Sequence, residues 1–166
     1  SRRAEQTMGM PASVRRWTAA EVRAMQDESR PAPRYELIDG ELLVTPSPRG
    51  VHQLAVIELS RKLADYVESE SLGVTVTSPA DIELEAESVT QPDLFVVPAA
   101  YAGPPLEWPN VRALLLAVEV LSPSSERQDR VVKRRFFQRL GVPEYWVIDL
   151  DARAVERWRP GDQVPD

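Results

Sequence analysis

A single carboxylate, Glu119, interrupts an otherwise apolar run over residues 114–121. Such a run is typical of a strand that is buried on both faces of a sheet, so it predicts the central strand of this fold. An unpaired ion in that position costs on the order of several kcal/mol, so a compensating charge must lie close to Glu119. A metal ion is the leading candidate for that charge.

The chain limits which metal could be bound. It contains no cysteine and one histidine, His52, which excludes thiolate sites and multi-histidine zinc sites within one chain. Asp93 precedes a second apolar run, residues 94–97, so neighbouring strands could bring Asp93 and Glu119 to one edge of the sheet. Two carboxylates, the backbone carbonyl of Val120 and water would suit Mg²⁺ or Mn²⁺. The alternatives are that Asp93 caps a turn and that Glu119 pairs with a core arginine.

Lys133 is a candidate to act beside these two acids. It shares a helix face with Phe136, Phe137 and Leu140, so its stem should follow the core and its ammonium should point inward. There it would stabilise negative charge on a phosphate or position the attacking water. The alternative is an i, i+4 ion pair with Asp129.

Periodicity, turn residues and capping residues predict the order of elements. The predicted helices are 19–28, 49–71 and 125–140, the first with a Thr18–Glu21 capping box and the last capped by Ser125 with Gln128. Residues 34–44 are predicted to form a hairpin that turns at Asp39-Gly40. The predicted strands are 74–78, 81–85, 94–97, 114–121, 145–149 and 154–158. The residues expected on the core face of the middle helix are Val51, Leu54, Ala55, Leu59, Leu63, Tyr66 and Val67.

This order predicts an α/β (α+β) fold with a mixed central sheet flanked by helices. The expected domain covers residues 18–160, between a flexible segment, 1–17, and a frayed tail, 161–166. No glycine-rich phosphate loop is present, which argues against nucleotide-cofactor chemistry. No apolar run is long enough to span a membrane, and no signal peptide is visible. The absence of cysteine favours a cytoplasmic protein.

Charge is distributed unevenly along the chain. The formal net charge of −6 argues against a surface that attracts nucleic acid as a whole. Residues 126–139 nevertheless hold six basic and two acidic side chains, and Arg127, Arg130 and Arg134 could bind phosphates there. The alternative is an ordinary solvated helix face.

Four segments together resemble one known family. The segments "YELIDGELLVTPSP", "QPDLFVV", "LAVEVLSPSS" and "DRVVKRRFFQRLGVPEYWVID" resemble the Uma2 family (DUF820) of restriction-endonuclease-like proteins, within the PD-(D/E)XK nuclease superfamily, over about residues 34–160. The resemblance implies that Asp93 and Glu119 bind the metal and that Pro92 is the motif proline. Leu121 stands where the superfamily has its lysine, and Lys133 on the following helix would replace it.

Further site residues follow from the same resemblance. The superfamily's first helix tends to supply an acid, for which Glu58 on the helix and Glu36 on the hairpin are the two candidates. His52 begins that helix and could bind phosphate or shuttle a proton, although a structural histidine is the alternative.

The resulting expectation is a Mg²⁺- or Mn²⁺-dependent endonuclease that hydrolyses DNA phosphodiester bonds. A nuclease-like binding or accessory module with little or no catalysis is the alternative, and an RNA-directed hydrolase would use the same site. A homodimer is also expected, because a single domain needs a twofold partner to cut both strands. The proline-rich loop 98–110, with Trp108, could form its interface.

Overall fold

A five-stranded mixed sheet forms the centre of the computed structural model, which describes residues 15–26 and 33–166. Its strands follow one another in chain order, and all neighbours are antiparallel except the parallel pair β5 and β6. The strands are β3 (Gly73–Thr77), β4 (Leu94–Pro98), β5 (Leu116–Val120), β6 (Glu144–Asp149) and β7 (Ala154–Trp158). Every residue of β5 is buried. The predicted central strand and the predicted mixed sheet are therefore confirmed.

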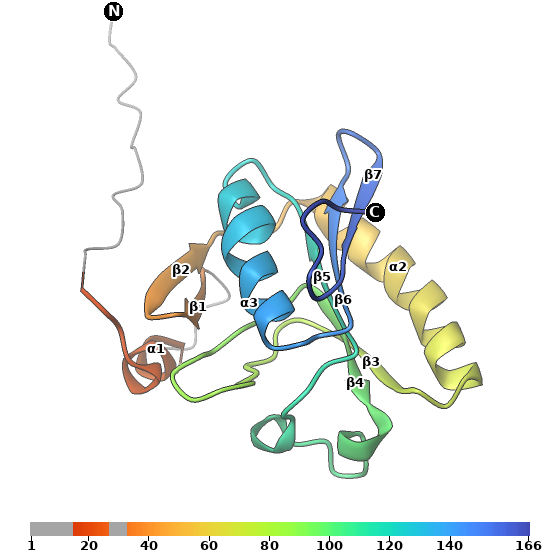
Figure 1. The fold of residues 1–166 in the computed structure, drawn as a ribbon, viewed down its shortest axis with the longest axis horizontal. Coiled ribbons are helices and arrows are strands. Elements are labelled where there is room, and N and C mark those ends of the chain that lie inside the picture. The colour runs from red at the N-terminus through yellow and green to blue at the C-terminus, as the bar shows by residue number, and fades with distance from the viewer. Residues whose placement is uncertain (1–14, 27–32) are drawn as a thin grey trace, which may run out of the picture.

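Helices cover both faces of this sheet (Figure 1). Side chains alternate along each strand, so Leu94, Val96 and Val118 pack with Val67 of α2 (Gly50–Ser69) on one face. On the other face, Phe95 and Ala117 pack with the phenylalanines of α3 (Arg134–Arg139). The same alternation turns Glu119 toward the α3 face, because it lies two residues after Ala117.

A separate hairpin joins the α3 side of the sheet. Its strands are β1 (Arg34–Ile38) and β2 (Glu41–Thr45), and Ile38 and Leu43 share the core cluster of α3. Asp39 and Gly40 have φ values of 51° and 78°, as the predicted two-residue turn requires. The hairpin therefore brings the buried Glu36 over the sheet.

The first helix, α1 (Ala19–Gln26), begins with the predicted capping box. The Glu21 amide donates to the Thr18 hydroxyl at 3.3 Å, and the Thr18 amide donates to a Glu21 carboxylate oxygen at 2.9 Å. Trp17 packs with Val22 of this helix and donates its amide to the Gly40 carbonyl at 3.3 Å. The predicted helix end at residue 28 and most of the predicted flexible segment lie outside the described residues.

Two predicted elements are wrong in part. Residues 81–85 form no strand, because only the isolated bridge between Ile82 and Thr90 pairs them. The predicted helix 125–140 contains a π-helical turn, η3 (Gln128–Lys133), before α3. The hydroxyl of Ser125 contacts the amide and hydroxyl of Ser122, three residues earlier in the chain.

The predicted core face of α2 is too wide. Leu59 and Leu63 pack on the sheet with Val67, whereas Val51 and Leu54 are 60% and 68% exposed. Tyr66 is also exposed. Spacings of three and four fit a stripe that is broader than the part of α2 that the sheet covers. The leucines that pack on the sheet with Val67 are spaced four residues apart.

The proline-rich loop and the C-terminal segment both lie against the sheet. Loop 98–110 contains the short 3₁₀ turns η1 (Ala99–Tyr101) and η2 (Trp108–Asn110), and the Trp108 ring packs edge-on against Phe95 at 5.8 Å between centroids. At the other end, Arg157 and Asp166 exchange two backbone hydrogen bonds, at 3.0 and 2.9 Å, so the predicted tail lies beside β7. Within the described residues, no helix is both long and apolar enough to cross a membrane.

Candidate active site

The charge that compensates Glu119 in this structure is the ammonium of Lys133. The Lys133 Nζ atom donates to the Glu119 Oε1 atom at 3.0 Å, and both side chains are 2% exposed. Glu119 lies in β5, and Lys133 is the last residue of the π-helical turn above it. The inward direction predicted for Lys133 therefore agrees with the structure.

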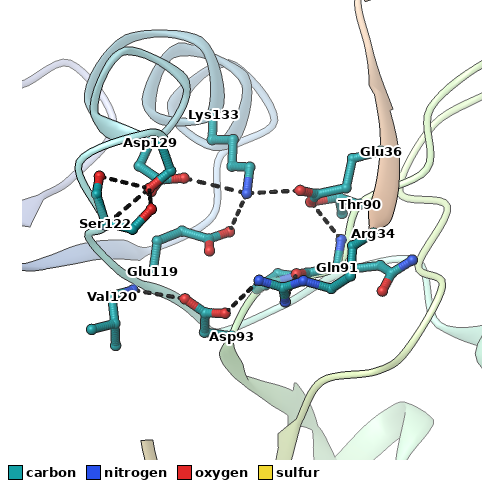
Figure 2. Close-up of polar contacts among 12 residues, drawn as sticks. Arg34, Glu36, Thr90, Gln91, Asp93, Glu119, Val120, Ser122, Asp129 and Lys133 are labelled. Carbon is teal, nitrogen blue, oxygen red and sulfur yellow. Dashed lines mark hydrogen bonds and ion pairs between the residues drawn. The ribbon is translucent and has the colours of Figure 1, made fainter. Parts of the chain in front are cut away.

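Lys133 lies between three carboxylates (Figure 2). Besides Glu119, its Nζ atom contacts Glu36 Oε2 at 2.8 Å and Asp129 Oδ1 at 3.3 Å. These four side chains are at most 3% exposed, and we refer to them as the Lys133 cluster. One ammonium cannot neutralise three carboxylates, so the cluster has an excess of acid.

Separate elements hold the two outer carboxylates of the cluster. The Glu36 Oε1 atom accepts from the Gln91 amide at 2.7 Å and from the Thr90 hydroxyl at 3.2 Å. Asp129 is the second residue of the π-helical turn, and its backbone carbonyl accepts the buried Tyr145 hydroxyl at 2.7 Å. The π-helical turn therefore directs Asp129 and Lys133 to the same side.

Asp93 lies beside Glu119 but has different partners. Its Oδ1 atom accepts from an Arg34 guanidinium nitrogen at 2.9 Å, while its Oδ2 atom contacts the Val120 amide at 2.8 Å and His52 Nε2 at 3.0 Å. Because β4 and β5 are neighbours, Asp93 at the start of β4 meets the end of β5. Asp93 and Glu119 therefore lie close together at one edge of the sheet, as the sequence predicts.

The two central acids differ in their affinity for a proton. Burial raises the pKa of Glu119 well above its usual value. The Lys133 ammonium lowers this pKa, but repulsion from Asp93 and Asp129 raises it further. Burial also raises the pKa of Asp129, for which Lys133 again only partly compensates. Burial alone would raise the pKa of Asp93, but its contacts with His52 and Arg34 lower it. Asp93 is therefore ionised, while Glu119 readily holds a proton.

Lys133 keeps its charge in this environment. Burial alone would lower the pKa of Lys133, but attraction from Glu119, Glu36 and Asp129 raises it well above the usual value. The ammonium is therefore a permanent positive charge beside Glu119.

The oxygen donors of this site suit a hard divalent cation. Asp93, Glu119, Asp129 and Lys133 border one pocket of about 560 Å³, and Asp93 and Glu119 repel each other across it. Within the described residues, no three histidine, aspartate or glutamate side chains converge as a ready-made metal cage. A metal here would therefore use the two carboxylates, the Val120 carbonyl and water.

The structure separates the remaining predicted site residues. Of the two acids considered, Glu36 joins the Lys133 cluster, whereas Glu58 is 63% exposed on α2 and pairs with Arg61 and Lys62. His52 is brought to Asp93. Glu58 is therefore not part of this arrangement, because its position on α2 turns it to solvent.

The basic segment 126–139 is largely neutralised by other elements. Arg130 pairs with Asp149 and Glu156, at 2.8 Å in each case, and also with Glu126. Arg134 lies over the Trp158 ring at 4.5 Å. Of the three arginines considered for phosphate binding, Arg127 is the most exposed, at 71%, and it pairs with Glu41.

Asp129 is the site residue that the sequence identified only as a possible ion-pair partner. Its spacing of four from Lys133 is common on solvated helix faces, so the spacing alone does not indicate a buried cluster. Its buried neighbours come from other elements: Tyr145 of β6 donates to its backbone carbonyl, and Glu36 of the hairpin shares the Lys133 ammonium with it.

Comparisons with known proteins agree with this architecture. The model of the Uma2 family, described as "Putative restriction endonuclease", matches residues 19–165. A crystal structure described as a "putative nuclease belonging to DUF820" from Anabaena variabilis matches with a TM-score of 0.67 and 21% sequence identity, covering 86% of this chain and 80% of that chain. No curated protein matches this chain. The structural match supports the same fold.

Proposed function

We propose that this chain, which belongs to the Uma2 family, is a metal-dependent endonuclease that hydrolyses DNA phosphodiester bonds. The observation that carries the proposal is the pair of buried acids, Asp93 and Glu119, at one edge of the sheet beside the ammonium of Lys133. Buried carboxylates with perturbed pKa values beside a fixed cation are typical of catalytic sites.

In this proposal, Asp93, Glu119 and the Val120 carbonyl hold Mg²⁺ or Mn²⁺. A divalent ion at this position would act as a Lewis acid and lower the pKa of a bound water. Asp93 is suited to this task because the His52, Arg34 and Val120 contacts keep its carboxylate ionised and fixed in direction.

Lys133 would stabilise the negative charge that grows on the phosphate during hydrolysis. Its ammonium is held in place by Glu36 and Asp129, so its positive charge acts from a fixed position when charge develops. Glu36 and Asp129 are positioning residues in this scheme, because they act on the substrate only through Lys133.

Metal binding and cleavage together test the proposal. We expect calorimetry to detect Mn²⁺ uptake by the protein, and Asp93→Asn or Glu119→Gln to abolish it together with cleavage of a DNA duplex. Glu58→Gln is the matched control, because it removes an exposed acid from the same domain. Mn²⁺ uptake that persists in both site variants would contradict the assignment of the metal ligands.

One observation favours the alternative, a nuclease-like binding module with little catalysis. Lys133 and Arg34 already pair with the acids of the site, and no three donors converge on a point among the residues that the structure describes. A protein that binds DNA but neither takes up Mn²⁺ nor cleaves DNA or RNA would establish this alternative.

A homodimer is part of the proposal, because one active site cuts one strand. Light scattering at micromolar concentration tests it, and a monomer in the presence of duplex DNA would remove this part of the proposal.

A further inference from the structure

The N-terminus of α2 borders the same pocket and has no side-chain cap. Residues 46–49, Val51 and His52 line the pocket, and α2 begins at Gly50. The Arg49 side chain makes no capping hydrogen bond, and the first turn contains no acidic residue. The first amides of a helix have no partner within the helix, and the helix dipole favours an anion beside them.

Three residues that line the pocket have a buried nitrogen or hydroxyl group without a hydrogen-bond partner. Thr45 is 9% exposed, and its hydroxyl has no hydrogen-bond partner within the described residues. The Nε atom of Arg34 and the Nδ1 atom of His52 also lack a hydrogen-bond partner within the described residues. All three residues line the pocket. A buried polar group without a partner is costly, so three of them in residues that line one pocket point to a polar ligand there.

The charges of the residues around these groups favour an anion as that ligand. Arg49 is exposed at the pocket rim, and the nearby Asp93 is matched by Arg34 and His52. An anion is therefore the ligand that the helix dipole and the basic side chains at this part of the pocket favour.

We infer that Thr45, Arg49 and the first turn of α2 form a phosphate subsite that is separate from the metal ligands. The inference rests on the proposed function for its ligand: an internal phosphate of the DNA backbone, held next to the one that is cleaved. Phosphate contacts of this kind fix the register of a nucleic acid without reading its sequence.

Two substitutions test the subsite with little risk to the fold. Gly50→Pro removes one amide donor at the first helical position, where proline is well tolerated. Arg49, with φ −75° and ψ 159°, already has the backbone conformation that a following proline requires. Gly50→Ala keeps the amide and is the matched control. Thr45→Val removes the hydroxyl at nearly constant volume.

The first measurement uses inorganic phosphate and needs no metal or cleavage. In EDTA, we expect a phosphate titration to shift the amide NMR signals of Val51, His52 and Gln53. Gly50→Pro and Thr45→Val should each weaken this binding about tenfold, whereas Gly50→Ala should bind like the unchanged protein. Absence of these shifts, or equal binding by Gly50→Pro and Gly50→Ala, would overturn the inference.

The second measurement distinguishes an internal phosphate from a terminal one. Fluorescence anisotropy with short duplexes that have a 5′-phosphate or a 5′-hydroxyl should show the same loss of affinity in Gly50→Pro. A loss confined to the 5′-phosphate duplex would overturn the internal assignment.

The two proposals fail separately. Phosphate binding that responds to the substitutions in a protein that never cleaves DNA would retain the subsite and remove the proposed function. If Gly50→Pro cleaves DNA with an unchanged KM, the proposed function is retained and the phosphate subsite is removed.

Discussion

At the scale of single residues, removing the Lys133 ammonium should lower the stability of the protein strongly. Lys133→Met keeps the apolar stem but leaves Glu36, Glu119 and Asp129 without their shared ammonium. We expect the free energy of unfolding to fall by about 3–5 kcal/mol at neutral pH, because uncompensated buried charge is that costly. Urea unfolding measures this.

The loss in Lys133→Met should shrink at acidic pH, because the raised pKa values of Glu119 and Asp129 let these two carboxyl groups bind protons and reduce the uncompensated charge. Arg135→Met is the control, because Arg135 is exposed on the same helix and should change stability by less than about 0.5 kcal/mol. Equal stability of Lys133→Met and this control would contradict the role of the cluster.

The raised pKa of Glu119 predicts how stability depends on pH. At pH values between the usual pKa of 4.5 and the higher pKa of Glu119 in the folded protein, the folded state binds a proton that the unfolded state has released. The stability that this proton contributes is fully present below pH 4.5. It is lost as pH rises through the pKa of Glu119 in the folded protein. Stability of the metal-free protein should therefore fall with rising pH in that window.

Glu119→Gln should reduce this loss, because the amide cannot ionise and Lys133 keeps two carboxylate partners. As pH rises above 4.5, Glu119→Gln should therefore become more stable relative to the unchanged protein. Glu58→Gln should show no such trend. A difference that moves the other way would contradict the raised pKa.

Asp93 and Glu119 could be predicted because each is a carboxylate next to or inside an apolar run. That contrast between charge and surroundings exists in the sequence itself. Glu36 could not be separated from Glu58 in the same way, since both lie in ordinary amphipathic segments and only the packing of the hairpin buries Glu36. The partners of Asp93 also come from β1 and α2, which no local pattern links to it.

At the scale of elements, the π-helical turn η3 is the feature that directs two charged residues inward. Tyr145 supports this turn from β6 through its hydroxyl. Tyr145→Phe should therefore lower the free energy of unfolding by about 1–3 kcal/mol, because the buried carbonyl of Asp129 loses its donor. It should also weaken Mn²⁺ binding if the turn orients the site.

Tyr66→Phe is the matched control for this prediction, since Tyr66 is 59% exposed on α2. Urea unfolding and calorimetry of both variants make the comparison. A Tyr145→Phe protein as stable as Tyr66→Phe would show that the turn holds without this hydrogen bond.

Most elements could be predicted because strong local signals mark them, as Asp39-Gly40 marks the hairpin and Thr18 with Glu21 marks the first helix. The π-helical turn could not be predicted, because its residues have the same spacing as an α-helix in the sequence. Residues 81–85 alternate like a strand, yet backbone pairing with a neighbour decides whether a strand forms, and only Ile82 finds one.

At the scale of the whole molecule, charge should make DNA binding depend on divalent ions. The chain has a formal net charge of −6, and Arg130 and Arg139 are neutralised by acids from other elements. We expect duplex DNA to bind weakly in EDTA and about tenfold or more tightly with Ca²⁺, because a bound cation offsets the acids of the pocket. Fluorescence anisotropy measures both affinities.

Asp93→Asn should lose most of the gain from Ca²⁺ in this experiment, because it removes a proposed ligand. Glu58→Gln should keep the gain. Equally tight binding in EDTA and in Ca²⁺ would show that the protein's own basic residues suffice.

The backbone pairing of Arg157 with Asp166 has a consequence for solubility. The strand β7 is the last of the sheet, and an open outer strand exposes amides and carbonyls to which another chain can add. At Arg157 the amide and the carbonyl are already used by Asp166. The returning segment thus shields this border of the sheet against intermolecular strand addition, the first step toward aggregation.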